Sequence, residues 1–324
     1  MNILIIGGAG YIGGVTAHLA HNESHQVTLL DDLSSGNDYN VPAGVELARI
    51  DVRDQPAVDA FFTGKPFDAV MHFAALILVP ESMQRPYDYF AVNSFGLLNT
   101  VNAAVRSGVR HYILSSTAAV YGNAEKPLAE TDPTNPVNPY GMSKLVAENI
   151  LASYALSHQL NWVALRYFNV AGAYGGVGTD YPFVSHLIPS LLVQMRKKKP
   201  IYINGNDYDT PDGTAVRDYT HVQDIARAHL LAAERMAQGT VLQQPINLAS
   251  NQGFSVKEVA ETFNAVTGAG LPVIYRPRRP GDPARLVANN QLAKTLLGWK
   301  PQHGLKKIIS DHYEWFMHES QRKR

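Results

Sequence analysis

The 324-residue sequence predicts an α/β fold, with a doubly wound parallel sheet and a smaller α/β lobe. Two observations indicate this fold. Short apolar runs alternate with helical patterns through the first half of the chain, as in parallel strands joined by right-handed crossovers. After Gly172 the alternation breaks, and Gly, Pro and Tyr crowd residues 172–182. We therefore expect a Rossmann-type domain over 1–172 and a second unit over 173–324, with 217–250 returning to the first domain.

Each element follows from its local pattern. The first domain should begin with a buried strand over 2–7 and a helix over 11–21. The remaining expected strands are 25–33, 45–52, 67–75, 109–117 and 161–172, and the long helices are 87–108 and 140–158. In the second unit we expect a helix over 183–199, a short strand and a polar turn over 203–219. Sheets of this kind bind ligands at the carboxyl ends of their strands.

Composition argues against several classes of function. Lysine plus arginine equals aspartate plus glutamate at 28 each, so no net charge favours nucleic acid or an anionic membrane. The longest apolar stretches fall short of a membrane span, and the opening "MNILIIGGAG" leaves no room for a charged leader. Cysteine is absent, which fits a reducing compartment, and the twelve histidines show no metal-binding spacing. We expect a cytoplasmic protein without a metal site.

The run "GGAGYIG" after the first strand predicts a dinucleotide site. Gly7, Gly10 and Gly13 permit a tight turn and close backbone approach, and the following helix offers N–H groups to a pyrophosphate. The second strand ends at Asp31, eighteen residues past Gly13, where a carboxylate accepts both ribose hydroxyls. Asp31 and Asp32 would repel a 2′-phosphate, which favours NAD over NADP. Further along, "IDVRD" places Asp51 and Val52 near the adenine, and "HFAA" brings Phe73, Ala74 and Ala75 to the cofactor's edge.

The stretch "NPYGMSK" sets Tyr140 and Lys144 on one face of a helix. A phenol with a pKa near 10 is a poor base at neutral pH. A cation about 6 Å away, at an effective dielectric of about 20, is worth roughly two pKa units. Lys144 and a positive nicotinamide together would lower the pKa of Tyr140 by about four units, making a base for an alcohol that loses hydride. "ILSSTAAVYG" supplies a neighbouring hydroxyl from Ser115, Ser116 or Thr117.

With these motifs in view, the chain resembles the extended short-chain dehydrogenases/reductases, and most closely the UDP-galactose (UDP-glucose) 4-epimerase family. The resemblance runs nearly end to end and includes "RYFNVAGA", "GNDYDTPDGTAVRDYTHV" and "RRPGD". The segment "GNDYDTPDGTAVRDYTHV" is the most discriminating, because in that family it belongs to the sugar-nucleotide lobe rather than to the cofactor site.

The resemblance implies an isomerase of galactose metabolism that interconverts UDP-galactose and UDP-glucose with NAD. Tyr140 would take the proton of the sugar 4-hydroxyl while hydride leaves C4, and the 4-keto sugar would turn before hydride returns to its other face. Thr117 would bind the 4-oxygen, and Lys144 would also hold the nicotinamide ribose. The family habit further implies a homodimer in which 87–106 and 140–158 pair with their copies as a four-helix bundle.

The resemblance also implies two sets of binding residues. The cofactor set is Gly7, Gly10, Tyr11, Ile12, Gly13, Asp31, Asp32, Asp51, Val52, Phe73, Ala74, Ala75, Asn93, Ser115, Tyr140, Lys144 and Tyr167. The substrate set is Thr117, Tyr140, Asn169, His186, Leu187, Asn204, Arg217, Tyr219, Arg279, Asp282 and Leu286. Two positions depart from the family pattern: Ile77 replaces a lysine that contacts the diphosphate, and His186 replaces an asparagine.

Three alternatives stand beside this interpretation. A 4,6-dehydratase shares the fold, cofactor and Tyr/Lys pair, but it usually needs Asp-Glu after the threonine, where this chain has Ala118 and Ala119. A non-catalytic dinucleotide-binding regulator usually loses the active-site tyrosine. An epimerase of UDP-pentoses (xylose and arabinose) is the closest alternative. Leu286, where a tyrosine would narrow the sugar pocket, also predicts turnover of N-acetylated sugars such as UDP-GlcNAc and UDP-GalNAc.

Overall fold

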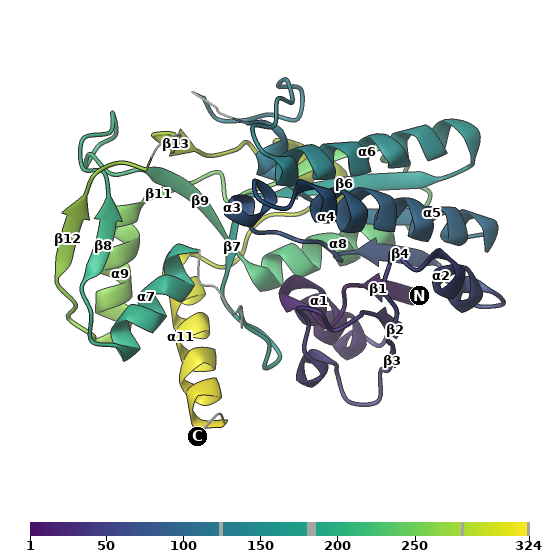
Figure 1. Ribbon diagram of the computed structural model, residues 1–324, viewed down its shortest axis with the longest axis horizontal. Helices are drawn as coiled ribbons and strands as arrows, with labels where there is room; N and C mark the ends of the chain where they lie inside the picture. Colours follow the sequence, from purple (N-terminus) through teal and green to yellow (C-terminus); the bar gives the residue numbers. More distant parts are fainter. Residues whose placement is uncertain (123–125, 180–185, 280–281, 323–324) are drawn as a thin grey trace.

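The computed structural model describes residues 1–122, 126–179, 186–279 and 282–322, and it confirms the predicted fold class (Figure 1). A seven-stranded parallel sheet has the order β10-β6-β5-β4-β1-β2-β3. Its strands are β1 (Asn2–Ile6), β2 (Gln26–Leu30), β3 (Glu46–Ala48), β4 (Ala69–His72), β5 (His111–Thr117), β6 (Asn161–Tyr167) and β10 (Gln244–Leu248). Chain order reverses between β1 and β4, and such a switch point is where open sheets bind ligands.

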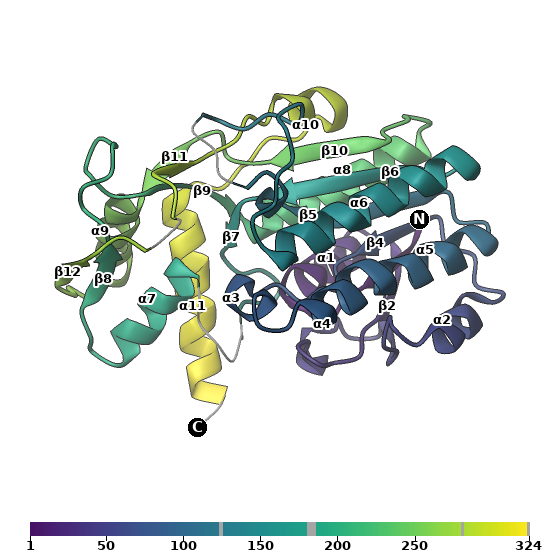
Figure 2. The ribbon, with the colours of Figure 1, turned by 45° about the horizontal axis from the view of Figure 1, so that its top comes forward.

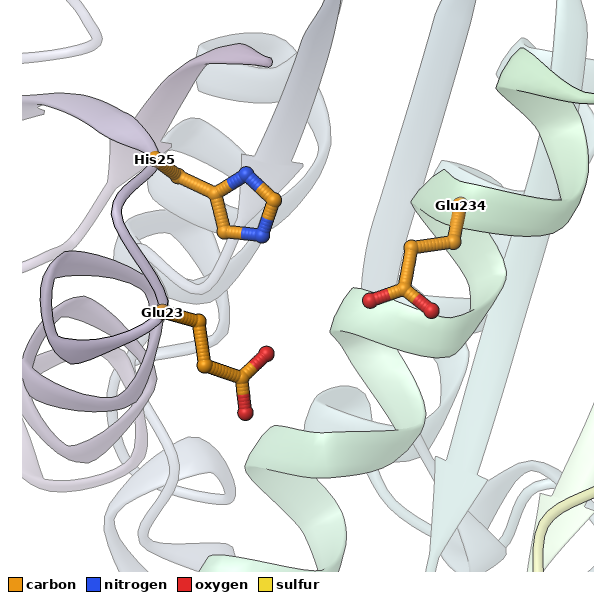
Figure 3. Close-up of side chains that lie close together, drawn as sticks. All are labelled: Glu23, His25 and Glu234. Carbon is orange, nitrogen blue, oxygen red and sulfur yellow. The ribbon is translucent and has the colours of Figure 1, made fainter.

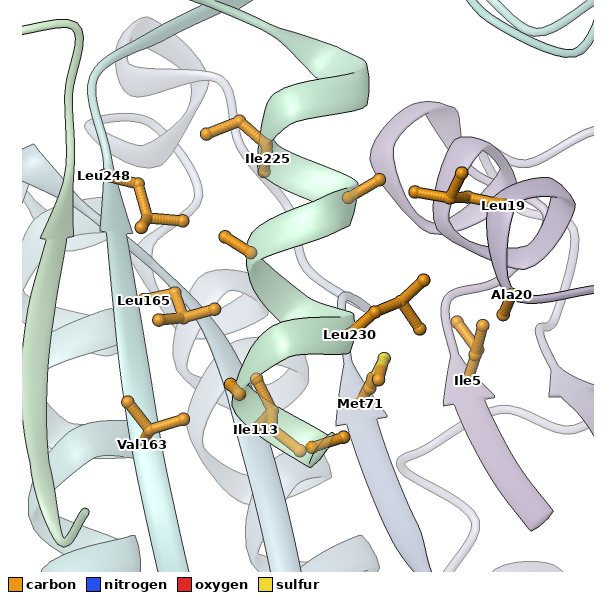
Figure 4. Close-up of a cluster of buried hydrophobic side chains, with 14 of the residues drawn as sticks. Ile5, Leu19, Ala20, Met71, Ile113, Val163, Leu165, Ile225, Leu230 and Leu248 are labelled. Carbon is orange, nitrogen blue, oxygen red and sulfur yellow. The ribbon is translucent and has the colours of Figure 1, made fainter. Parts of the chain in front are cut away.

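Helices cover both faces of this sheet. Alternate residues of β1 face opposite ways, so Ile3 and Ile5 enter one apolar cluster while Leu4 and Ile6 enter another. The first cluster packs under α1 (Tyr11–Asn22) and α8 (Val222–Ala237), and Figure 4 shows Ile225 and Leu230 of α8 over the strands. The second packs under α2 (Gln55–Phe62), α5 (Leu97–Arg106) and α6 (Pro139–Ser157). Figure 2 shows α5 and α6 running side by side.

Two predicted elements are divided in the structure. The helix predicted over 87–108 consists of α4 (Pro86–Phe90), a π-helical turn (Ala91–Gly96) and α5. The strand predicted over 161–172 divides at Phe168 into β6 and β7 (Asn169–Ala171), and β7 leaves the central sheet to pair with β9 (Val216–His221). The sequence reading also assigned no helix at α2 or at the single turn α3 (Val79–Ser82), and it assigned none after residue 199.

The smaller lobe is built from short strands and helices (Figure 1). Strands β7, β9, β11 (Gly253–Ser255) and β13 (Arg285–Leu286) form one sheet, and β8 (Ile201–Asn204) pairs with β12 (Val273–Arg276). The helices α7 (Leu187–Arg196), α9 (Val256–Thr267) and α11 (Leu305–Arg322) enclose a third apolar cluster. Of the helix predicted over 183–199, residues 183–185 lie outside the described residues.

Residues 217–250 contribute to both units. Strand β10 belongs to the central sheet and helix α8 packs against it, whereas β9 belongs to the smaller sheet. The described elements are completed by α10 (Gln291–Leu297) and 3-10 turns at Asp38–Asn40 and Ala118–Val120. A domain boundary at residue 172 remains our proposal. Within the described ranges, no helix has both the length and the apolar character needed to cross a membrane.

Candidate active site

The glycine-rich turn leaves β1 with almost no space for side chains. Gly7 has φ +78°, and a Cβ built on it would lie 2.4 Å from the backbone nitrogen of Ala74. A Cβ on Gly13 would lie 2.1 Å from the carbonyl oxygen of Gly7. Gly10 is extended and precedes the first residue of α1, so the helix N-terminus faces the turn. This backbone-lined cradle suits an anionic diphosphate, which helix N-terminal N–H groups bind.

Asp31 directly follows β2 beside this turn and is buried. Its carboxylate accepts hydrogen bonds from the backbone N–H groups of Ala9 and Leu33, both at 2.9 Å. Burial raises the pKa of Asp31, and these two hydrogen bonds oppose that change. Asp32 is exposed and instead accepts from the N–H and hydroxyl of Ser34, at 2.9 and 2.6 Å. Asp31 is therefore the carboxylate held toward the cradle.

The other predicted cofactor residues fall into two groups. Asp51 pairs with Arg53 at 2.6 Å, which lowers the pKa of Asp51, and the side chain of Val52 lies under Gly96. The Tyr11 hydroxyl donates to the carbonyl of Gly172 at 2.7 Å, so this side chain joins α1 to the end of β7. Ile12 is partly buried against the cluster under α1.

The loop after β4 is held by Asn93, from inside the π-helical turn. The Asn93 amide accepts from the N–H of Leu76 at 2.8 Å and donates to its carbonyl at 3.0 Å. It also donates to the Ser143 hydroxyl at 3.0 Å, which connects this loop to α6. Phe73 and Ala74 donate backbone N–H groups to the carbonyl of Ile6, and Ala75 follows them, so these residues border the glycine-rich turn. Ile77 lies in this loop next to Leu76, and its side chain carries no charge.

Tyr140 and Lys144 stand one turn apart near the start of α6. Asn138 caps the helix by accepting from the Gly141 N–H at 2.8 Å, with Pro139 in the first turn. Lys144 is 2% exposed, and its ammonium donates to the carbonyl of Ser115 at 2.9 Å. The Thr117 hydroxyl at the end of β5 lies within hydrogen-bonding reach of the Tyr140 phenol. The structure therefore brings the three predicted catalytic side chains together.

The protonation states correct one expectation. Burial raises the pKa of Tyr140, with Thr117 opposing, whereas the sequence reading considered only the lowering of this pKa by Lys144 and a positive nicotinamide together. Desolvation of a buried phenol disfavours its anion, and that term was missing from the sequence argument. Burial also lowers the pKa of Lys144 to about 7, with Glu148 opposing, so Lys144 titrates near neutral pH.

Ser115 and Tyr167 lie beside this group. The Ser115 hydroxyl is within hydrogen-bonding reach of the Tyr167 phenol, whose oxygen lies 2.9 Å from Nε2 of His229. Nδ1 of His229 lies 2.9 Å from the carbonyl of Ile225, so Nδ1 carries the proton and Nε2 accepts from Tyr167. The His229 ring also lies 4.5 Å from that of Phe73. Nothing in the sequence pattern singled out His229.

The predicted substrate residues of the smaller lobe form two pairs. Arg217 of β9 donates to the carboxylate of Asp282. With its amide oriented to satisfy both partners, Asn204 at the end of β8 accepts from Arg279 at 3.1 and 3.2 Å. Paired guanidinium groups of this kind bind phosphate oxygens well. Within "RRPGD", Pro280 and Gly281 lie outside the described residues.

The remaining predicted substrate residues are dispersed. Asn169 donates to the backbone carbonyl of Asp218 at 3.1 Å, and the adjacent Tyr219 is buried in the apolar cluster of the lobe. Leu187 begins α7, and His186 is exposed at its N-cap position. Leu286 aligns with Arg217 in the β9–β13 register and packs against a cluster containing Val120 and Tyr121. Leu286 thus packs against the cluster to which the turn after Thr117 contributes.

A group with metal-ligand chemistry lies far from this site. Figure 3 shows Glu23 and His25 facing Glu234 of α8, with one ligand atom from each within 4.8 Å of the others. The guanidinium of Arg227 binds both carboxylates, at 2.7 and 3.2 Å, and the N-terminal ammonium lies 3.3 Å from His25. Both carboxylates already have a cationic partner, so we interpret the group as an ion-pair network.

Comparison with known proteins gives one consistent result. Residues 3–249 match the model of the NAD dependent epimerase/dehydratase family. A UDP-glucose 4-epimerase of Corynebacterium glutamicum is 43% identical over 314 residues, covering 96% of this chain and 94% of that protein. A UDP-glucose 4-epimerase structure from Stenotrophomonas maltophila, with bound NAD and formylated UDP-arabinopyranose, matches with TM-score 0.94 and 36% identity over 99% of both chains. The UDP-Glc/GlcNAc 4-epimerase of Campylobacter jejuni matches with TM-score 0.86 and 37% identity, covering 98% of this chain and 99% of that one.

Proposed function

The chain belongs to the NAD dependent epimerase/dehydratase family, and from this membership we propose that it is a UDP-glucose 4-epimerase. It interconverts UDP-galactose and UDP-glucose through a 4-keto sugar, with NAD as its bound cofactor. One observation carries the proposal. Thr117, Tyr140 and Lys144 meet at the carboxyl end of β5, two strands from the glycine-rich turn of β1.

The residues of the cradle fit NAD. Gly7 and Gly13 leave only backbone against the diphosphate, and Asp31 offers a carboxylate to the adenosine ribose. A 2′-phosphate would meet that buried carboxylate, which favours NAD over NADP. When bound, NAD supplies the acceptor and later the donor of hydride. Lys144, whose ammonium donates to the Ser115 carbonyl, would also bind the nicotinamide ribose.

Proton transfer is the task of Tyr140. Its phenolate accepts the proton of the sugar 4-hydroxyl as hydride leaves C4, and Thr117 donates a hydrogen bond to the same oxygen. After the keto sugar turns and hydride returns to the opposite face, Tyr140 gives the proton back to the 4-oxygen. Protons and electrons balance over the cycle, so no external oxidant or reductant is consumed.

The smaller lobe would bind the UDP moiety of the substrate while the sugar turns. Arg217 and Arg279 present guanidinium groups for the diphosphate, and Asp282 and Asn204 offer oxygen acceptors for the nucleoside. Because binding is concentrated on the UDP moiety, the sugar can present either face to the cofactor while the nucleotide stays held.

The alternatives are less well supported. In place of the acid–base pair of a dehydratase, Ala118 is buried and Ala119 donates its N–H to Thr117 at 3.1 Å, and neither can transfer a proton. A regulator without activity would have no use for the assembled Thr117, Tyr140 and Lys144. Pentose activity remains the second candidate, because the Stenotrophomonas structure holds a UDP-arabinopyranose derivative.

Product analysis tests the proposed function. Purified protein is incubated separately with UDP-galactose, UDP-xylose and UDP-N-acetylglucosamine, and the sugars are identified by NMR. We expect UDP-glucose from UDP-galactose as the fastest conversion. Faster conversion of the pentose would favour the second candidate, and a 4-keto-6-deoxy sugar would identify a dehydratase.

We also propose a cytoplasmic homodimer. Apolar side chains are exposed along the expected dimer helices: Tyr87 is 80% exposed, Phe95 60% and Leu156 92%. Burying them against a second copy would form a four-helix bundle from the α4–α5 segment and α6. Light scattering should give twice the 35.5 kDa chain mass at micromolar concentration. A monomer at that concentration would contradict the bundle.

A further inference from the structure

A buried acid lies behind the Tyr140/Lys144 pair on the same helix. Glu148 follows Lys144 by four residues, as Lys144 follows Tyr140, so the three side chains share one face of α6. Glu148 is 4% exposed, and its carboxylate accepts from Arg166 Nε at 2.9 Å and Nη2 at 2.5 Å. It also accepts from the Ser116 hydroxyl at 2.5 Å.

These contacts tie α6 to the two strands that carry the site. Ser116 lies between Ser115, whose carbonyl binds the Lys144 ammonium, and Thr117, which reaches Tyr140. Arg166 belongs to β6, and its guanidinium lies 4.7 Å from the centre of the Tyr121 ring. A buried ion pair is weak evidence for a stabilising role, since apolar side chains of similar volume often serve as well. Because Glu148 lies one helical turn from Lys144, we looked for a role of its carboxylate other than stability.

The charges around Lys144 indicate such a role. From β4 it faces His72, whose pKa is lowered to about 3 by burial and by Lys144, so this ring is neutral. From β6, the cation Arg166 binds Glu148, and the phenol of Tyr167 lies within hydrogen-bonding reach of Ser115, the residue whose carbonyl binds Lys144. On α6 itself are Tyr140 and Glu148. Among these groups Glu148 is the anion present before Tyr140 ionises, and it balances one of two buried cations.

We propose that Glu148 is a positioning residue of the reaction, a role that rests on the proposed function: its carboxylate keeps Lys144 an ammonium beside Tyr140 and holds α6 against the ends of β5 and β6. Because burial brings the pKa of Lys144 to about 7 even with Glu148 opposing, loss of the carboxylate leaves Lys144 neutral at neutral pH. Tyr140 then loses a cation worth roughly two pKa units.

The test is a titration of Tyr140 that needs no substrate. Tyrosinate absorbance of the NAD-loaded protein is followed against pH, with Tyr140→Phe in each background as the blank. Glu148→Gln should raise the pKa of Tyr140 by about one to two units. The acid limb of kcat for UDP-galactose should move upward by the same amount, with KM changed less than threefold. An unmoved Tyr140 titration in folded Glu148→Gln protein overturns the proposal.

Two controls separate charge from structure. Glu148→Asp keeps the charge and should titrate like the unmodified protein. Glu234→Gln breaks a Glu–Arg pair of similar chemistry on remote α8 and should leave the Tyr140 titration unchanged. An equal shift in either control would mean that the effect is structural, and would overturn the proposal.

A folding failure also has a defined outcome. If Glu148→Gln does not fold, the double variant Glu148→Gln/Arg166→Gln, which leaves no unpaired guanidinium, replaces it. Its Tyr140 titration should still move upward, since the carboxylate that favours the ammonium form of Lys144 is absent from this variant as well. No movement in the double variant overturns the proposal. Absence of turnover of UDP-galactose by the unmodified protein would contradict the proposed function alone, because the titration uses no sugar.

Discussion

A buried phenol acts as a base at neutral pH only when nearby cations outweigh the cost of burying its anion. In this site burial raises the pKa of Tyr140. Burial also lowers the pKa of Lys144 to about 7, so Lys144 stays protonated at neutral pH only if its surroundings favour the ammonium form. Catalytic competence therefore depends on charges beyond the Tyr/Lys pair. The positive nicotinamide and the carboxylate of Glu148 act in the same direction, each by favouring the ionised form of its neighbour.

Replacement of Tyr140 by phenylalanine should abolish epimerisation while leaving NAD bound. The phenol is the proton acceptor, and the cradle around Gly7 and Asp31 holds the cofactor without it. Loss of a general base costs roughly 10²–10⁴-fold in rate. Initial rates with UDP-galactose and the NAD content of the purified variant measure the two effects. A rate within tenfold of the unmodified protein would rule out this role for Tyr140.

Leu286 is the predicted gate of the sugar pocket. It packs against the cluster that holds Val120 and Tyr121, and by the sequence hypothesis a side chain smaller than tyrosine would leave room for an acetamido group. Leu286→Tyr should lower kcat/KM for UDP-N-acetylglucosamine about tenfold, which corresponds to about 1.4 kcal/mol in activation free energy. The values of kcat/KM for the hexoses without an acetamido group should change little. The ratio of kcat/KM for the two substrates in both proteins is the measurement. Leu286→Met, which conserves volume, serves as the control, and an unchanged ratio in the tyrosine variant would remove Leu286 from the gate.

At the scale of elements, the start of α6 aims the catalytic side chains. Asn138 accepts a hydrogen bond from the Gly141 N–H, and Pro139 is the first helical residue. Together they define the first turn of α6, from which the Tyr140 side chain projects. On the opposite side of Ser143, the π-helical turn brings Asn93 to the loop after β4. One extra residue in a helical turn redirects a side chain, which is a frequent use of π turns at functional sites.

Asn138→Ala should lower the free energy of unfolding by about 1 kcal/mol, because the Gly141 N–H loses its cap. Denaturant unfolding monitored by circular dichroism measures the change. Ser153→Ala, at an exposed position in the interior of the same helix, is the matched control and should be near neutral, since alanine has the higher helix propensity. A loss in the control as large as that in the cap variant would show that capping is not the cause.

Sequence patterns predicted the elements well where one pattern extended over a whole element. Residues close together in the sequence determine strand β1, helix α1, the capped start of α6 and the glycine-rich turn. These features could therefore be predicted from local patterns. The break at Phe168 was missed because β6 and β7 are separated by that single residue, and only the pairing of β7 with the distant β9 distinguishes the two strands. His229 and the Glu148–Arg166 pair were missed for the same reason, since their partners are remote in sequence.

At the scale of the whole molecule, buried imidazoles join the central sheet to the smaller lobe. His221 caps α8 and lies 3.0 Å from Asp311 of α11, while His312 of α11 lies 2.7 Å from Thr179. Burial lowers the pKa of His221 to about 4 and that of His312 to about 3. Both rings are neutral in the folded protein at neutral pH, and their hydrogen bonds require that state.

The unfolding free energy should therefore fall steeply in mild acid. The folded pKa values lie below the ordinary value of 6.5, so the unfolded chain takes up protons first as pH falls. The stability these groups contribute is complete above about pH 6.5 and is lost as pH falls toward 4, with about 2 kcal/mol lost through His221 alone by pH 5. His312→Gln keeps a polar partner for Thr179 and should flatten the dependence of unfolding free energy on pH between 6.5 and 5 by nearly one proton. His158→Gln, at an exposed ring, should leave the slope as it is in the unmodified protein. Chemical denaturation at half-unit intervals of pH measures all three proteins, and equal slopes for the His312 variant and the unmodified protein would mean that this imidazole does not couple protonation to folding.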